Sequence, residues 1–282
     1  MALTVNTNVT SLNVQKNLNK ASDALSTSMT RLSSGLKINS AKDDAAGLQI
    51  ATRMTSQIRG QTMAIKNAND GISIAQTAEG AMQEQTNILQ RMRELAVQSR
   101  NDSNSSDDRD ALNKEFSQMA AELTRIAGST NLNGKNLLDG SASTMTFQVG
   151  SNTGATNQIT LDLNGKFDAV SLGITSGITI AGSSTTIAET NFSAAVGAID
   201  TALKTINASR ADLGAAQNRL TSTISNLQNI NENASAALGR VQDTDFAAET
   251  AQLTKQQTLQ QASTSVLAQA NQLPSAVLKL LQ

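Results

Sequence analysis

The chain has 282 residues, a formal net charge of −1 and no His, Cys, Trp or Tyr. The missing imidazole and thiol groups exclude Ser-His-Asp and Cys-His catalysis and the usual zinc ligands, so we expect no enzyme, no cofactor and no metal site. A near-neutral charge without basic clusters argues against nucleic-acid binding. The sequence contains no run of about 18 apolar residues, so we expect no membrane-spanning helix. The N-terminal residues lack the basic and apolar regions of a cleaved signal peptide.

Both ends of the chain carry an apolar residue at every seventh position. Leu18, Leu25 and Leu32 form the N-terminal series. The C-terminal series consists of Leu259, Val266, Leu273 and Leu280. An isolated amphipathic helix takes most of its stability from packing. We therefore expect the two terminal helices to pair with each other or with neighbouring copies of the chain.

Two long helices with matching apolar seams are predicted further inside the chain. The first seam alternates Ile58, Ile65 and Ile72 with Met54, Ala68, Ala75, Met82, Leu89 and Ala96. The second seam, between residues 196 and 241, includes Leu203, Leu213, Leu220, Ile224 and Leu227. A repeat that averages 3.5 residues is the coiled-coil pattern, because it holds one face of a helix toward its partner. Arg210, Gln217 and Asn231 interrupt the second seam, where they either fix the register or lie where the bundle meets solvent.

Segments rich in Asn, Ser and Asp indicate where helices begin and end. Asp43 and Asp44 precede the first long helix, where the macrodipole favours a capping carboxylate. Residues 100–110 break the pattern, and a third helix is predicted from about Asp107 to Ala127. The carboxylates between residues 102 and 110 lack the spacing and the closing Glu of a calcium loop. We expect a solvated turn there.

A region rich in Gly, Ser and Thr follows the third helix, and residues 128–182 hold nine of the 17 glycines. Residues 144–149 and 158–163 each alternate apolar and polar positions, which predicts a β-hairpin. The apolar positions are Met145, Phe147, Val149, Ile159, Leu161 and Leu163. Residues 128–136 resemble a phosphate-binding loop, but the glycine spacing and the residue after Lys135 differ from that motif, so we expect a glycine-rich turn.

Several segments resemble blocks of bacterial flagellins and occur in the same order. They are TRLSSGLKINSAKDDAAGLQIA at 30–51, LQRMRELAVQS at 89–99, NLNGKNLLDG at 131–140, DTDFAAET at 243–250 and ANQLPSAVLKLL at 270–281. On these blocks the sequence is identified as a member of the flagellin family. The resemblance agrees with the predicted seams and implies a mainly α fold. That fold is a long antiparallel coiled-coil helix bundle with paired N- and C-terminal helices and a small central β-hairpin region.

The resemblance further implies three parts of the chain. Residues 1–40 with 246–282 would form a terminal coiled-coil assembly domain, residues 41–140 with 190–245 a long-helix bundle, and residues 141–189 a short hairpin or variable region. It implies a structural subunit that leaves the cell unfolded through the flagellar type III channel and polymerises outside into the filament used for swimming. The implied partners are further copies of the chain, an export chaperone, hook-associated and cap proteins, and, in hosts, Toll-like and NAIP-type receptors.

Two contact regions are also implied by the resemblance. Leu89, Arg91, Leu95 and Glu115 resemble positions that flagellins present to a neighbouring protofilament and to a Toll-like receptor. The tail residues Val277, Leu278, Leu280 and Leu281 resemble the apolar end that takes part in assembly and is recognised by NAIP-type receptors. The alternative is a hook-filament junction protein, a hook-associated relative that has the same terminal helices and does not polymerise indefinitely.

Overall fold

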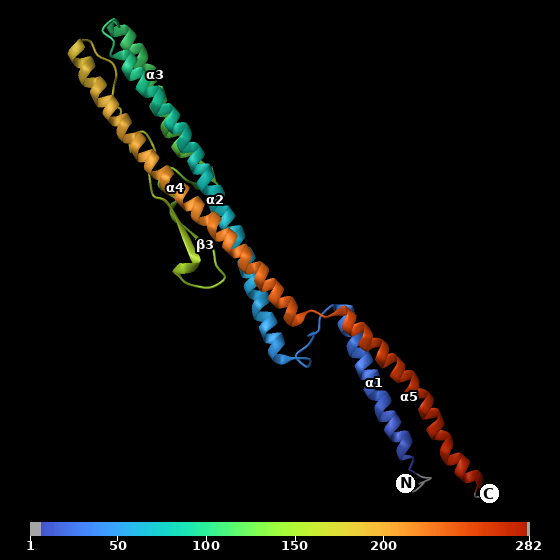
Figure 1. Cartoon of the computed structure of the whole chain (residues 1–282). Coiled ribbons are helices and arrows are strands. Elements are labelled where there is room, and N and C mark those ends of the chain that lie inside the picture. Colours follow the sequence, from blue (N-terminus) through green and yellow to red (C-terminus); the bar gives the residue numbers. More distant parts are fainter. Residues whose placement is uncertain (1–6, 281–282) are drawn as a thin grey trace. The chain divides into compact units, whose positions relative to one another are not determined.

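The computed structural model describes residues 7–280, with side chains up to residue 272, and its fold is mainly helical as predicted (Figure 1). The helices within this range are α1 (Val9–Ser34), α2 (Ala45–Ser99), α3 (Ser106–Ser129), α4 (Thr185–Gln242) and α5 (Phe246–Leu280). The strands are β1 (Asn131–Leu132), β2 (Lys135–Asn136), β3 (Ser143–Gln148) and β4 (Gln158–Leu163). A short 3-10 turn, η1 (Ala155–Asn157), precedes β4.

The chain divides into two compact units. Unit 1 contains the residues up to 58 and those from 232 onward, and unit 2 contains residues 59–231. Helices α2 and α4 contribute residues to both units. The Gly/Ser/Thr-rich residues 141–189 lie wholly within unit 2. The three-part division implied by the flagellin resemblance stays a prediction, and its borders after residue 40 and before residue 246 differ from those of the two units.

In unit 1, helices α1 and α5 run antiparallel along each other (Figure 1). At one end of the pair the Asn8 side-chain amide donates a hydrogen bond to the carbonyl oxygen of Ala270 (2.7 Å). At the other end Arg31 Nη1 lies 3.6 Å from Glu249 Oε2. Ala21 is buried between the predicted leucines of α1, which are themselves half-buried. The predicted pairing of the two terminal helices is therefore present within one chain.

Of the two carboxylates predicted to cap α2, Asp44 does so, whereas Asp43 stabilises the turn that precedes the helix. Asp44 Oδ1 accepts a hydrogen bond from the Gly47 N–H at 2.9 Å. Asp43 Oδ2 accepts from the N–H groups of Ser40 (2.9 Å) and Asn39 (3.1 Å). These hydrogen bonds stabilise the charged carboxylate, so they lower the pKa of Asp43 below its ordinary value.

The largest apolar core of unit 2 is formed by α2, α3, α4 and the connecting region, residues 130–184, which joins α3 to α4. The core residues are Ala75, Ala78, Met82, Leu89, Met92, Leu95 and Ala96 of α2; Phe116, Leu123 and Ala127 of α3; Ala195, Ile199, Ala202, Ile206, Leu213 and Ala216 of α4; and, from the connecting region, Leu137, Leu138, Leu161, Leu163, Phe167, Ala169, Leu172, Ile174 and Ile180. The Gly/Ser/Thr-rich region therefore supplies a large share of the core. Only Leu161 and Leu163 of the hairpin were predicted there from an alternating pattern, and the other buried residues of the region follow no regular spacing.

The predicted seam residues are buried to different degrees. On α4, Leu213, Leu220 and Leu227 are buried, whereas Leu203 and Ile224 are half-buried. On α2 the isoleucines Ile58, Ile65 and Ile72 are half-buried. Of the positions that alternate with them, Ala68, Ala75, Met82, Leu89 and Ala96 are fully buried and Met54 is half-buried. Small residues therefore occupy much of the centre of the α2 face, and the isoleucines flank it.

The predicted hairpin is confirmed, with the predicted faces. Met145 of β3 pairs with Leu161 of β4, and Phe147 pairs with Ile159, so the apolar residues of both strands share one side. The side-chain amide of Asn67 on α2 donates to the carbonyl oxygen of Gln148 (3.0 Å). This bond fastens the hairpin to the helix on which its apolar face packs.

A second, two-residue hairpin replaces the phosphate loop that residues 128–136 resembled. Strands β1 and β2 pair antiparallel and are joined by Asn133 and Gly134. These two residues have φ values of 52° and 75°. Positive φ at both central residues is the type I′ turn, for which Asn-Gly is the preferred sequence. The glycine here serves a tight turn.

Candidate functional site

The predicted C-terminal apolar series lies at the edge of the α1–α5 seam. Leu259 and Val266 expose 45% and 46% of their surface. The residues that follow them, Gln260 and Leu267, are half-buried. One residue turns a helix by about 100°, so the neighbouring series faces α1 and the predicted series faces outward. Leu259 and Val266 therefore remain available to a partner other than α1.

Further apolar side chains are uncovered on the same two helices. Val9, Leu12 and Met29 of α1 are 57–58% exposed, and Phe246 at the start of α5 is 55% exposed. Exposed apolar residues that occur singly are normal on a protein surface, whereas contiguous apolar patches mark interaction sites. We call Val9, Leu12, Met29, Phe246, Leu259 and Val266 the outer apolar set.

The predicted tail residues lie at the limit of the structure. Val277, Leu278 and Leu280 fall on the backbone of α5, but their side chains lie outside the described residues, as do those of Leu273 and all of Leu281. Their predicted role stays a prediction.

Arg91 forms an exposed ion-pair cluster that joins α2 to α3. Its Nε and Nη2 donate to one carboxylate oxygen of Glu115, at 3.2 and 3.0 Å, and its Nη1 donates to Glu94 at 3.0 Å. The Arg91 and Glu115 side chains are 47% and 39% exposed. The hydrogen bonds that Arg91 donates to Glu94 and Glu115 raise the pKa of its guanidinium above the ordinary value. The cluster presents a fixed arrangement of both charge signs at the surface.

Leu89 and Leu95 do not share this surface. Both side chains are 0% exposed, as is Met92 between them. The burial of Leu89 agrees with its predicted place in the seam. In the single chain, however, Leu89 and Leu95 are not part of an exposed contact face, so their assignment to that face is corrected. The physical reason is that α2 packs against α3, α4 and the connecting region together, which buries a wider arc than a two-helix seam. Arg91 and Glu115 are the surface members of the predicted contact.

Two ion pairs to α4, one from α2 and one from the residue that follows it, were not predicted from the sequence. Arg93 Nη1 lies 2.6 Å from Asp200 Oδ1, and Arg100 pairs with Glu189 as well as with Asp102. Arg93 and Asp200 are 107 positions apart in the chain. No local sequence signal connects residues at such a separation. The seams predicted the pairing of the two helices, but not its register.

The polar residues that interrupt the α4 seam face polar groups on α2. Gln217 Nε2 donates to Glu79 Oε2 at 2.9 Å, and Arg210 Nη2 lies 3.9 Å from Glu79 Oε1. Asn231 Nδ2 donates to Thr62 Oγ1 at 3.3 Å. All three residues are half-buried, so they lie at the edge of the seam and also form interhelical contacts. The sequence left open whether these residues fix the register of the helices or lie where the bundle meets solvent, and the arrangement combines both.

Arg109 is a buried charge that no sequence pattern predicted. It is 5% exposed and donates only to main-chain oxygens: Nε to Ser99 (3.1 Å), Nη1 to Gly182 (3.3 Å) and Nη2 to Asn101 (3.4 Å). Ser99 is the last residue of α2, so the guanidinium caps a negative helix end from the neighbouring helix. One side chain thereby ties together α2, α3 and the loop before α4.

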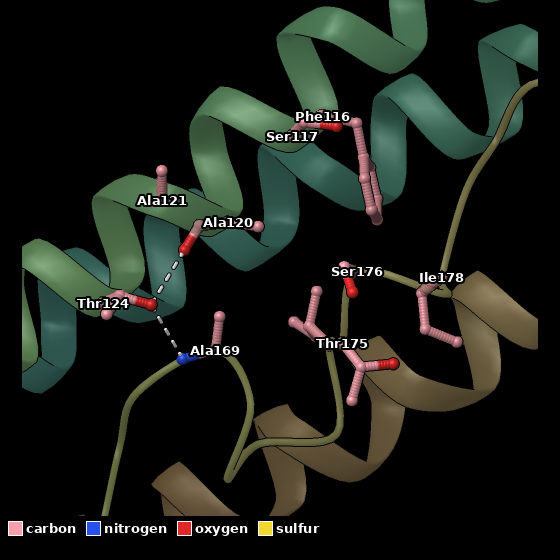
Figure 2. Close-up of a pocket in the computed structure, with 10 residues that line it drawn as sticks. Phe116, Ser117, Ala120, Ala121, Thr124, Ala169, Thr175, Ser176 and Ile178 are labelled. Atoms are coloured by element: carbon pink, nitrogen blue, oxygen red, sulfur yellow. Dashed lines mark hydrogen bonds between the residues drawn. The ribbon is translucent and has the colours of Figure 1, made fainter.

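A cavity of about 290 Å³ lies between α3 and the connecting segment 169–178 (Figure 2). Phe116, Ala120 and Ile178 line it together with hydroxyl-bearing residues such as Ser176, and no lining residue is titratable. Thr124 Oγ1, which donates to the Ala120 carbonyl, accepts the Ala169 N–H at 3.3 Å and fastens the segment to α3. This lining offers no acid, base or nucleophile pair for catalysis.

Other kinds of site are absent from the described part of the chain. Residues 7–280 contain no group of three His, Cys, Asp or Glu side chains that could hold a metal ion. Among the helices that the structure describes, none has a stretch that is both long and apolar enough to cross a membrane.

The chain resembles known proteins over its whole length. Its residues 5–143 match the model of the bacterial flagellin N-terminal helical region, and residues 196–281 match that of the C-terminal helical region. Flagellin B and flagellin A of Vibrio cholerae are 43% and 41% identical to it over 375 and 382 aligned positions, covering 100% of each chain. These alignments are longer than the 282-residue chain, so the relatives contain residues that have no counterpart here.

A solved structure has the same fold. It is described as a flagellar hook-associated protein from Vibrio parahaemolyticus, with a TM-score of 0.60 and 14% identity over 71% of this chain and 100% of that one. At this identity the likeness concerns the fold alone. The family models and the full-length relatives carry the assignment. The chain belongs to the bacterial flagellin family and is a structural filament subunit, not an enzyme.

Proposed function

We propose that the α1–α5 pair of unit 1 is the part of this flagellin that joins subunits, and that the outer apolar set is covered by neighbouring copies in the filament. The observation that carries the proposal is the 45–58% exposure of these six apolar side chains on the two terminal helices. Covering an apolar side chain contributes roughly 1.5 to 3 kcal/mol when its burial is complete. Contacts repeated from copy to copy without closure generate a helical polymer.

The exposed Arg91–Glu115 cluster is proposed as a second contact, with a neighbouring protofilament in the filament and with a Toll-like receptor when the subunit is free. Its exposure and its flagellin-like sequence block support this role. Electrostatic complementarity at such a rim contributes mainly to specificity and to the rate of association. The tail at residues 277–281 is proposed as an assembly element that NAIP-type receptors also recognise.

Delivery of the subunit follows from the same resemblance. We infer that the chain is exported unfolded through the flagellar type III channel, with the helix around Leu259 and Val266 held by an export chaperone beforehand. The exposed side chains of these residues would then contact the chaperone first and neighbouring subunits later. At its two ends the filament would meet hook-associated and cap proteins.

Elongation from filament seeds tests the assembly proposal. Purified subunits are added to short filament fragments, and filament length is measured by negative-stain electron microscopy. Leu259→Gln combined with Val266→Gln should abolish elongation, as should deletion of residues 246–282. Gln261→Ser is the matched control, because it changes an exposed polar residue of the same helix. Normal elongation of the double variant would refute the proposal, and short stubs from the unaltered chain would favour the hook-filament junction alternative.

A further inference from the structure

The methionines differ sharply in their exposure to solvent. Met29 of α1 and Met63 of α2 are 58% and 54% exposed, whereas Met82 and Met92 are 1% and 0% exposed. The remaining described methionines, Met54, Met119 and Met145, are half-buried. Thioether oxidation follows exposure, so a soluble oxidant reaches Met29 and Met63 first.

The two exposed methionines lie in different parts of the molecule. Met29 is in unit 1, beside the fully buried Ser28 and at the edge of the α1–α5 seam. Met63 belongs to unit 2. Met29 is therefore a member of the outer apolar set, and Met63 has comparable exposure outside it. Oxidation of Met29 is therefore expected to affect assembly, whereas oxidation of Met63 is not.

We propose that Met29 is an oxidation site whose sulfoxide form prevents the subunit from joining a filament. The inference rests on the proposed role of the outer apolar set. In the reaction a Met29 sulfur lone pair attacks one oxygen of a hydroperoxide, the O–O bond breaks, the sulfur gains that oxygen, and water or an alcohol leaves. The sulfur is oxidised by two electrons and the peroxide is reduced by two.

The physical effect of this change is large for such a small group. Methionine is a flexible apolar side chain that fills irregular gaps, whereas its sulfoxide is polar and carries a strong hydrogen-bond acceptor. Burying that oxygen in an apolar contact without a donor is unfavourable. An oxidised subunit should therefore keep its fold, since Met29 is exposed in the single chain, but lose its ability to add to a filament end. Reduction by methionine sulfoxide reductase should restore it.

The test uses full-length subunits treated briefly with hydrogen peroxide and then freed of it. Peptide mapping by mass spectrometry follows the sulfoxide at each methionine, and seeded elongation is measured on the same samples. The matched variants are Met29→Leu and Met63→Leu, which keep an apolar side chain of similar volume. The peroxide-treated parent and Met63→Leu should lose elongation, whereas treated Met29→Leu should retain it. Circular dichroism should show unchanged helicity in every sample.

Two outcomes would overturn the inference. In one, Met29 is fully converted to sulfoxide and elongation is unchanged. In the other, treated Met29→Leu loses elongation as fully as the parent, which would assign the effect to another residue. Failure of the proposed assembly surface is recognised separately, because untreated Leu259→Gln/Val266→Gln would then elongate normally. Treatment with sulfoxide reductase should restore elongation if Met29 sulfoxide causes the loss. It would not restore elongation after irreversible damage.

Discussion

Arg91 on α2 and Glu115 on α3 are joined by two hydrogen bonds to one carboxylate oxygen, at 3.2 and 3.0 Å. The pair bridges two helices at the surface, directly beside a core in which Leu89 and Met92 are 0% exposed. The charged pair thus lies at the surface over a closely packed core, so its removal can be separated from damage to the fold.

Arg91→Ala is expected to leave the thermal unfolding curve almost unchanged while weakening the response of a Toll-like receptor reporter. Exposed ion pairs contribute little to stability because solvent screens them. Arg125→Ala is the control, since Arg125 also forms an exposed pair, with Glu122 of its own helix. Loss of helicity by circular dichroism, or a reporter response equal to that of the unaltered chain, would contradict the proposed contact.

Leu89→Ala is expected to lower the free energy of unfolding by roughly 2 to 5 kcal/mol, because it leaves a cavity in the core of unit 2. Urea titration followed by circular dichroism measures the change. Val97→Ala on the same helix is the matched control, because Val97 is 56% exposed. Equal losses for the two variants would show that the leucine is not part of a close-packed core.

Replacing two glycines of α2 by alanine should change the stability of the chain differently. A Cβ at Gly80 meets no atom within 4 Å, whereas a Cβ at Gly71 would lie 3.2 Å from Leu220 Cδ1 and 3.3 Å from the Phe147 ring. Gly80→Ala should stabilise the chain by about 1 kcal/mol through helix propensity. Gly71→Ala should lose that gain through crowding between α2, α4 and β3. Equal stabilisation of both variants in urea titrations would argue against the close approach.

The capping box of α3 should make part of the stability sensitive to acid. Hydrogen bonds from the Ser105 N–H and hydroxyl lower the pKa of Asp108 below its ordinary value. A folded-state pKa below the unfolded one means that the stabilisation is complete above the unfolded pKa and is lost as the pH falls through the folded pKa. Asp108→Asn should therefore reduce the loss of stability on acidification below the ordinary Asp pKa of 3.8.

Asp107→Asn is the control for this pH experiment, because Asp107 lies in the same first turn but outside the capping box. Melting temperatures measured across the acid range compare the two variants with the parent. If Asp108→Asn and Asp107→Asn gave the same pH profile, the effect would belong to the helix dipole and not to the capping box.

Local features of the fold were predictable because they depend on residues close in the sequence. The capping role of Asp44, the pairing of β3 with β4 and the start of α3 near Asp107 each follow from a few neighbouring side chains. The connecting region was harder to interpret. Phe167, Leu172 and Ile180 are buried in the core without any periodic spacing. Their burial depends on how the segment folds over α3.

The long helices and their 3.5-residue seams could be predicted from the sequence, since periodicity and caps act within one or two turns. The sequence also indicated that each terminal helix needs a partner, but it left open whether that partner is the other terminal helix or a neighbouring copy. Which of two adjacent series on α5 faces α1 depends on the packing of the two helices. Leu259 is 45% exposed, whereas Leu267, on the face turned toward α1, is half-buried. The tertiary structure also places Leu95 inside and Arg91 outside. The reason is that α2 is covered from several sides, so the burial of each side chain depends on contacts with residues that are distant in the chain.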